Sequence, residues 1–120
     1  MADLDRLALK LELRRLLTEA ARRRATLRYA DLARDAQVPP PHTIHKTAEL
    51  LEEILREDHA AGRPLLTALA VSRRDDATPA PGFFHLLLEL GRYDGPDRGP
   101  EAVKTHRAEL EDAWAWWGRA

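Results

Sequence analysis

Three side chains with metal-binding chemistry lie close together near the middle of the chain: His42, His45 and Glu49. Spacings of three and four residues place side chains on one face of a helix. Imidazole and carboxylate together form a common ligand set for zinc and related ions. No fourth ligand accompanies them, and imidazoles at an exposed helix start are usually solvated. The sequence therefore predicts neither a metal site nor a cofactor.

Nucleophilic catalysis also lacks its usual sequence patterns. The chain has no cysteine, which excludes thiolate chemistry and disulfide bonds. Ser72 has no Gly-x-Ser-x-Gly elbow around it and no histidine nearby in the sequence. No glycine-rich phosphate loop precedes a predicted helix. We therefore expect a protein that is not an enzyme and has no small-molecule substrate.

Arginines are the more informative polar residues because they can neutralise phosphates. Residues 1–34 carry nine Lys and Arg against five Asp and Glu, a net charge of +4, whereas residues 35–120 carry ten against fifteen, a net charge of −5. The candidate nucleic-acid-binding residues are Arg14, Arg15, Arg22, Arg23, Arg24, Arg28, Arg73 and Arg74. The last two follow a predicted strand, at the base of a loop that could enter a groove of DNA.

A second interpretation of these arginines stays open because the helix predicted over residues 43–60 is acidic. Its polar face carries Glu49, Glu52, Glu53 and Glu57. Carboxylates beside phosphates are repelled unless a base amino group or a cation compensates for them. The arginines could therefore pair with this helix within one chain or across a homodimer, and the sequence weighs this interpretation equally with nucleic-acid binding.

The predicted elements that position these residues are mostly helical. Apolar residues at helical spacing predict a first helix over residues 3–24, where Leu4, Leu7 and Leu11 are continued by Leu16, Leu17 and Ala20. Further segments are an edge strand at 26–28, helices at 29–36, 43–60, 83–90 and 100–117, a buried strand near 67–72, and a loop or wing over 74–82. The 120 residues suit one domain. No apolar run is long enough to span a membrane and no signal peptide precedes the first helix, so we expect a cytoplasmic protein.

The central part of the chain resembles the DNA-binding domain of alkylguanine-DNA alkyltransferases and alkyltransferase-like proteins. The likeness rests on the run Thr26-Leu27-Arg28-Tyr29-Ala30-Asp31-Leu32-Ala33, on Val38-Pro39, on Pro64-Leu65-Leu66 and on the strand that ends Val71-Ser72-Arg73. It implies an α+β, mostly helical, winged-helix-like core over residues 26–82. Long flanking helices, residues 1–25 at the N-terminus and residues 83–120 at the C-terminus, complete the domain.

The family's Pro-Cys-His-Arg motif has no counterpart between Leu66 and Arg73, so the alkyl-transfer activity does not carry over. The chain is also similar to short uncharacterised bacterial proteins. We therefore expect a non-catalytic bacterial interaction module with nucleic acid as its partner. The alternative is a protein-binding or homodimerising domain.

The tryptophans near the C-terminus bear on that alternative. Trp114 and Trp117 share a helical stripe with Leu110, which predicts that both pack on the core. Trp116 lies about 200° away from Trp114 at the helical pitch and should point elsewhere. Tryptophan is enriched at protein interfaces, so Trp116 is the predicted protein-contact residue.

Overall fold

The computed structural model describes residues 3–74 and 76–119. The elements in this part of the chain are α1 (Asp3–Arg22), β1 (Leu27–Arg28), α2 (Tyr29–Asp35), α3 (Thr43–Ala60), the 3₁₀ helix η1 (Leu66–Leu69), β2 (Ala70–Val71), α4 (Pro81–Glu89) and α5 (Pro100–Trp117). The expected mostly helical α+β class is confirmed, and each predicted helix is present within a few residues of its predicted bounds. Helix α3 begins one residue after His42, which has a left-handed backbone.

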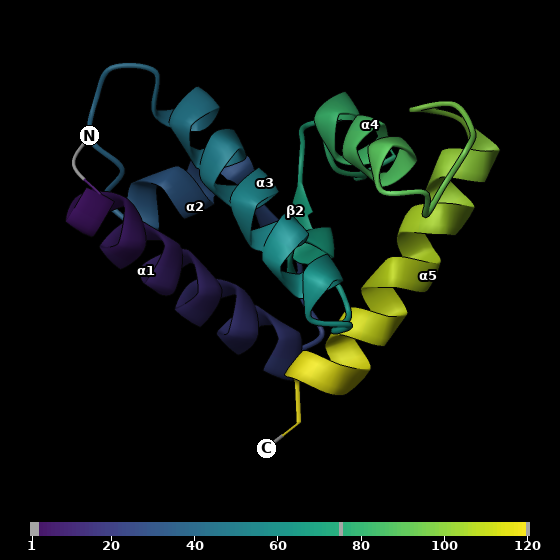
Figure 1. The fold of residues 1–120 in the computed structure, drawn as a ribbon, viewed down its shortest axis with the longest axis horizontal. Coiled ribbons are helices and arrows are strands. Elements are labelled where there is room, and N and C mark those ends of the chain that lie inside the picture. Colours follow the sequence, from purple (N-terminus) through teal and green to yellow (C-terminus); the bar gives the residue numbers. More distant parts are fainter. Residues whose placement is uncertain (1–2, 75, 120) are drawn as a thin grey trace.

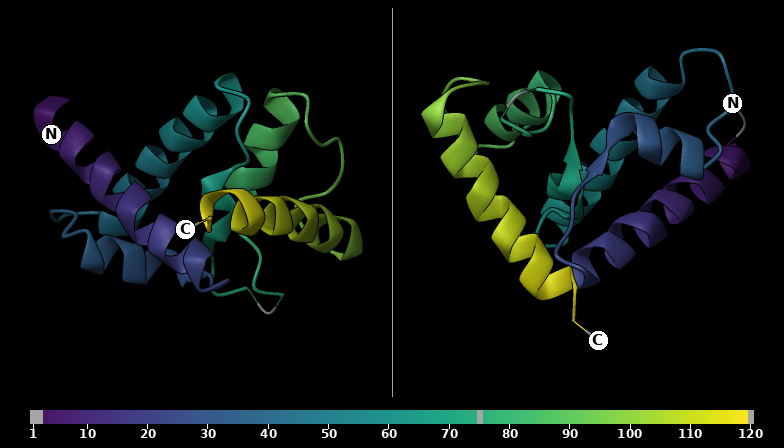
Figure 2. Two further views of the ribbon diagram at one scale, coloured as in Figure 1. Left: turned by 90° about the horizontal axis from the view of Figure 1, so that it is seen from below. Right: turned by 180° about the vertical axis from the view of Figure 1, so that it is seen from behind.

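The helices form two arms that meet at one end of the molecule (Figure 1). Helices α1 and α3 pack against each other in one arm, while α4 and α5 belong to the other. The C-terminal end of α5 lies against the end of α1, and both helices contact η1 between the arms. The view from behind shows the chain running from the end of α1 through β1 to α2 (Figure 2).

The sheet is much smaller than the sequence suggests. Strands β1 and β2 pair in parallel over two residues each, with Leu27 beside Ala70 and Arg28 beside Val71. The first half of the strand expected at 67–72 is instead part of the 3₁₀ helix η1, whose four residues are all buried. This helix packs against α1, α3 and α5, so its side chains must point in several directions. A strand presents only two faces and could not supply all of these contacts.

The segment between β2 and α4 occupies the position of the expected wing and extends outward from the body (Figure 2). Its described residues, 72–74 and 76–80, form no strand. Residue 75, which lies inside the expected loop, is outside the described residues. The loop is nevertheless fastened at its base, because the Ser72 N–H donates to the Thr78 carbonyl oxygen at 3.0 Å.

Buried side chains gather in two clusters. The larger cluster joins α1, α2, α3, η1 and the end of α5, and it includes Leu17, Leu50 and Trp114. The smaller one lies between α3, α4 and α5 and includes Phe84 and Leu87. Burial of this apolar surface, at about 25 cal/mol per Å², provides the main driving force for folding.

Helix α1 carries two apolar stripes, whereas the sequence had indicated one continuous stripe. Leu13 and Leu17 are fully buried, but Leu4, Leu7 and Leu11 are 80%, 53% and 59% exposed. At 100° per residue, Leu11 and Leu13 lie about 200° apart, on opposite sides of the helix. The neighbouring elements cover only one of these sides, so the outer leucine stripe remains at the surface.

Candidate nucleic-acid interface

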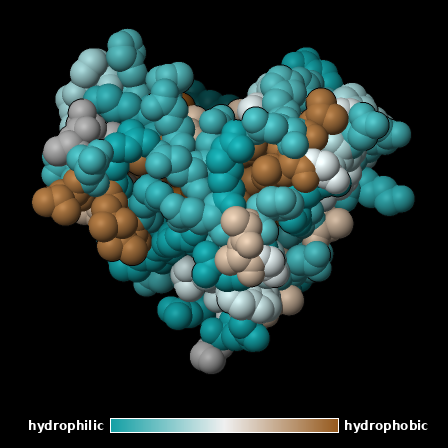
Figure 3. All heavy atoms as spheres, in the orientation of Figure 1, coloured by the Kyte–Doolittle hydropathy of each residue, from teal (hydrophilic) through white to brown (hydrophobic). Residues whose placement is uncertain are grey.

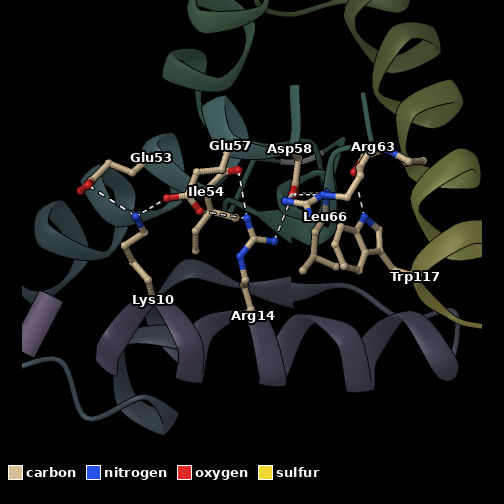
Figure 4. Close-up of polar contacts among 10 residues, drawn as sticks. Lys10, Arg14, Glu53, Ile54, Glu57, Asp58, Arg63, Leu66 and Trp117 are labelled. Atoms are coloured by element: carbon tan, nitrogen blue, oxygen red, sulfur yellow. Dashed lines mark hydrogen bonds and ion pairs between the residues drawn. The ribbon is translucent and has the colours of Figure 1, made fainter. Parts of the chain in front are cut away.

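Arg14 is the first of the predicted nucleic-acid-binding residues, and it faces the interior (Figure 4). Its Nη1 lies 3.0 Å from Oδ1 of Asp58, and its Nη2 donates to Oε1 of Glu57 at 3.0 Å. Asp58 is completely buried on α3. A buried charge needs paired and hydrogen-bonded partners, so Arg14 is a structural residue that joins α1 to α3.

The same carboxylate holds a second segment of the chain. Nη2 of Arg63 donates to Oδ1 of Asp58 at 3.0 Å, and the Leu66 N–H donates to Oδ2 at 3.3 Å. The Trp117 ring lies beside both guanidinium groups, 5.8 Å from Arg14 and 5.5 Å from Arg63, and its N–H donates to the Pro64 carbonyl oxygen at 2.8 Å. Asp58 therefore organises the point where α1, α3, α5 and the segment before η1 meet.

Two more cations of α1 face the acidic side of α3. Arg6 pairs with Glu53, and Lys10 pairs with both Glu53 and Glu57. Burial opposes the charged form of Glu57, but hydrogen bonds from Lys10 and Arg14 outweigh it and lower the pKa of this carboxyl group. The cations of α1 thus neutralise part of the acidic helix α3 within one chain. Of the predicted nucleic-acid-binding arginines, Arg14 contributes to this pairing.

Arg15 and Arg24 pair with carboxylates that do not belong to α3. Arg15 pairs along its own helix with Glu12 at 2.5 Å and with Glu19 at 3.2 Å. Arg24 pairs with Glu111 of α5 at 2.7 Å, and its guanidinium lies over the Trp114 ring at 4.7 Å. These pairs are exposed, and exposed pairs contribute about 0–1 kcal/mol each, so they leave both arginines able to exchange partners.

Four of the predicted arginines are exposed and have no carboxylate partner among residues 3–74 and 76–119: Arg22, Arg23, Arg28 and Arg73. Arg23 donates only to the carbonyl oxygen of Glu19, at 3.5 Å. The strand pairing places Arg28 beside Val71, two residues before Arg73. Arg22 is the last residue of α1, Arg23 follows it, and β1 begins at Leu27. We call these four residues the arginine face.

Arg74 has a supporting role in the loop after β2. It is half-buried and donates to the carbonyl oxygens of Pro79 at 3.2 Å and Asp97 at 2.6 Å. The Ala80 N–H donates to the hydroxyl oxygen of Tyr29, the first residue of α2, at 3.0 Å. These bonds fix the loop that carries Arg73 against the start of α2, and Arg74 itself is directed inward.

Several histidines have polar partners in the structure. His45 lies 2.8 Å from Glu49, and no group of three metal-ligating side chains occurs among the described residues. His106, to which the sequence analysis assigned no role, is buried and donates to the Ala68 carbonyl oxygen at 2.8 Å. The buried side of α5 includes Ala102, His106 and Leu110, whereas Val103 and Arg107 are exposed. The spacing of four residues between Ala102, His106 and Leu110 could have indicated from the sequence that the three share one helix face.

A small apolar hollow between α3 and α4 was also missed. It has a volume of about 50 Å³ and is lined by Tyr29, Leu51, Glu52, Thr67 and Phe83, among others. Its polar groups are two hydroxyls and one carboxylate, with no histidine among the lining residues.

As expected, Trp114 and Trp117 pack on the core, but Trp116 is less exposed than expected. Trp114 belongs to the larger core cluster and donates to the Ala25 carbonyl oxygen at 3.0 Å, and Trp117 packs against the same cluster. Trp116 is half-buried, because its ring meets Trp117 edge-on at 4.6 Å and Arg119 covers it at 4.5 Å. One side of Trp116 therefore remains accessible to a partner.

Comparisons of the chain with family models, curated proteins and solved structures find no match. Among the described residues, no helix has both the length and the apolar character needed to cross a membrane.

Proposed function

We propose that this protein is a non-catalytic interaction module on a winged-helix-like scaffold, and that the arginine face binds the phosphate backbone of nucleic acid. The observation that carries the proposal is the division among the predicted arginines. Arg14 forms an ion pair with the buried Asp58. Four others, Arg22, Arg23, Arg28 and Arg73, are exposed without a carboxylate partner in the described part of the chain. Unpaired guanidinium groups are good ligands for phosphate oxygens.

The order of elements supports the winged-helix part of the proposal. A helix, a short strand, two helices and a second short strand precede an extended loop, as in a winged helix. Helices α2 and α3 contact each other and are separated by the proline-containing segment 39–41, and contact between two consecutive helices is what a helix-turn-helix pair requires. The loop after β2 follows the second strand in the chain, as a wing does, and it carries Arg73.

The acidity of α3 weighs less against this proposal than its sequence suggests. Glu53, Glu57 and Asp58 face the cations of α1 and are neutralised there. The first turn of α3 contains His45 and Lys46 and no acidic residue. Because the N-terminal residues of a recognition helix make most of its base contacts, this end of α3 can approach a phosphate backbone without repulsion from its own first turn.

Salt-dependent binding to a generic DNA duplex tests the proposal directly. Each neutralised phosphate contributes a slope of about −0.9 to log affinity against log salt concentration. We expect measurable binding of a fluorescently labelled duplex by anisotropy at low salt, with a slope near −3 to −4 if all four arginines engage. The single changes Arg28→Ala and Arg73→Ala should each make the slope less steep by about 1.

Arg56→Ala is a matched control, because Arg56 is exposed on α3 and pairs with Glu89 away from the arginine face. It removes the same charge, so a general charge effect would weaken binding equally in the control and in Arg73→Ala. Binding that is absent even at low salt would overturn the proposal and favour a protein partner.

Protein binding is the second candidate function, and one observation favours it. Leu4, Leu7 and Leu11 form an apolar stripe on the surface of α1. Large apolar groups gathered on a surface are typical of protein–protein contacts. Trp116 lies near the opposite end of the chain and would belong to a separate contact.

A further inference from the structure

The hollow between α3 and α4 contains an unsatisfied polar atom. Thr67 of η1 lines this hollow and is only 3% exposed, and its Oγ1 has no hydrogen-bond partner among the described residues. No other buried side-chain nitrogen or oxygen in that part of the chain lacks a partner. A buried hydroxyl is rarely left unpaired, because it gives up its hydrogen bonds to water on folding. A group that enters the hollow could supply the missing partner.

A second hydroxyl group belongs to the same hollow. The Ala80 N–H donates to the hydroxyl oxygen of Tyr29 at 3.0 Å, and Ala80 and Tyr29 both line the hollow. The Tyr29 hydroxyl itself donates to no acceptor within residues 3–74 and 76–119. An alcohol group both donates and accepts hydrogen bonds. It is therefore a suitable partner for either of these hydroxyls.

The rim of the hollow carries a negative charge. Glu52 lines the hollow from α3, is exposed, and has no cationic partner in the described part of the chain. A Cβ atom at Gly82 would lie 3.4 Å from Oε1 of Glu52, so the carboxylate lies against the first turn of α4. The space-filling view shows a notch between the arms that carry α3 and α4 (Figure 3). A cation can therefore reach Glu52 from solvent.

The size of the hollow limits what it can hold. Its volume is about 50 Å³, and one water molecule requires about 10–15 Å³ of such volume. The enclosed space thus accommodates about three to five non-hydrogen atoms. Apart from the polar groups described above, the walls are apolar and include Leu51, Leu55 and Phe83. The middle of a ligand that fits this site should therefore be hydrocarbon.

We propose that this hollow binds a short aliphatic amino alcohol, a small cation with a hydroxyl group at one end and an ammonium group at the other. The hydroxyl group pairs with Thr67, the methylene groups contact Leu51 and Phe83, and the ammonium group lies beside Glu52 at the rim. The proposal goes beyond nucleic-acid binding and uses none of the arginine face, so either proposal can fail without the other.

An NMR titration of the ¹⁵N-labelled chain with 4-amino-1-butanol tests the site. We expect shifts of the amide signals around the hollow and a dissociation constant of about 1 mM, since so few atoms provide limited affinity. Butylamine lacks the hydroxyl group and n-butanol lacks the ammonium group, so each should bind about fivefold more weakly. Equal affinities for the three compounds would overturn the proposal. An absence of shifts at about 20 mM would overturn it as well and leave Thr67 to an ordered water molecule.

Glu52→Gln tests the contact at the rim, because it removes the charge with little change in shape. Binding of 4-amino-1-butanol should weaken about threefold to fivefold, whereas binding of n-butanol should not change. Glu49→Gln is the matched control, since Glu49 is exposed on the same helix and does not line the hollow. An equal loss of affinity in the control would show an effect of overall charge and contradict the proposed contact.

Thr67→Val tests the buried hydroxyl with two measurements. Removing an unpaired buried group should raise the melting temperature of the free protein by about 2–5 °C, while 4-amino-1-butanol should bind about fivefold more weakly. Thr47→Val is the control, because the buried Thr47 hydroxyl donates to the Thr43 carbonyl oxygen at 2.7 Å and its loss should not raise the melting temperature. A Thr67→Val variant that binds as tightly as the wild type would overturn the proposal. A lower melting temperature would also overturn it, since the hydroxyl would then have a partner in the free protein.

Discussion

Arg14 of α1 and Asp58 of α3 form an ion pair at 3.0 Å in which the carboxylate is completely buried. Arg63 and the Leu66 N–H bind the same carboxylate from the segment that leads into η1. One side chain therefore links the distant helix α1 to the end of α3 and to the segment that directly follows α3.

Removing the Asp58 carboxylate should destabilise the protein strongly. Asp58→Ala leaves two guanidinium groups without their buried partner, and breaking a buried pair in this way costs about 3–5 kcal/mol. Urea denaturation followed by circular dichroism would measure the loss. Glu57→Ala is the control, because the Glu57 side chain is 44% exposed and should cost under about 1 kcal/mol. Equal losses for the two variants would show that Asp58 has no special role.

Stability should decline below about pH 6.5 because of His106. Burial lowers the pKa of this imidazole from its ordinary value of 6.5, even though its bond to Ala68 opposes that effect. The unfolded chain then binds a proton at a higher pH than the folded chain does, so lowering the pH through 6.5 favours unfolding. Above that pH the contribution of His106 to stability is complete.

Thermal melts between about pH 5 and pH 8 would measure this effect. His106→Gln keeps a hydrogen-bond donor for the Ala68 carbonyl oxygen but cannot become charged in this pH range. We expect this variant to have a flatter pH profile, and an unchanged profile would assign the pH dependence to other groups. His85→Gln is the matched control, because the His85 side chain is 67% exposed.

The three tryptophans should differ in their contributions to stability. Trp114→Ala removes a buried ring and a hydrogen bond to Ala25, and deletions of this kind cost about 3–5 kcal/mol. Trp116→Ala should cost about 1 kcal/mol, because the ring is only half-buried. Urea denaturation of both variants and of Trp117→Ala compares them. Equal, large losses for all three would place Trp116 in the core and remove it as a protein-contact residue.

Gly118 should tolerate no side chain. A Cβ atom there would lie 2.5 Å from the Trp114 carbonyl oxygen and 2.7 Å from that of Ala21. Both are backbone atoms, so Gly118→Ala forces α5 away from α1 and should cost about 1–3 kcal/mol. At Gly95 the nearest atoms are the flexible ends of the Tyr93 and Glu101 side chains. Gly95→Ala should therefore cost much less in the same denaturation experiment, and a reversed order would contradict this account of the contact.

The sequence by itself determined the helices, because their periods, their polar ends and the breaks between them are local properties. The pattern of residues 43–60 predicted α3 with its bounds nearly correct, and Pro100 marked the start of α5. The two short strands were located approximately from turn residues and apolar runs. The sequence pattern could not distinguish the buried leucine stripe of α1 from the exposed one. The leucines of α1 occupy more of the helix surface than the neighbouring elements cover.

Only the tertiary structure decided how the charges are used. The sequence weighed pairing and phosphate binding equally, because charge alone does not specify which cation faces which carboxylate. Packing α1 against α3 directed Arg14 to Asp58, and pairing β1 with β2 brought Arg28 near Arg73. The same packing turned Leu13 inward and left Leu11 in solvent. Such outcomes depend on contacts between distant segments, and a local pattern carries no information about which segments meet.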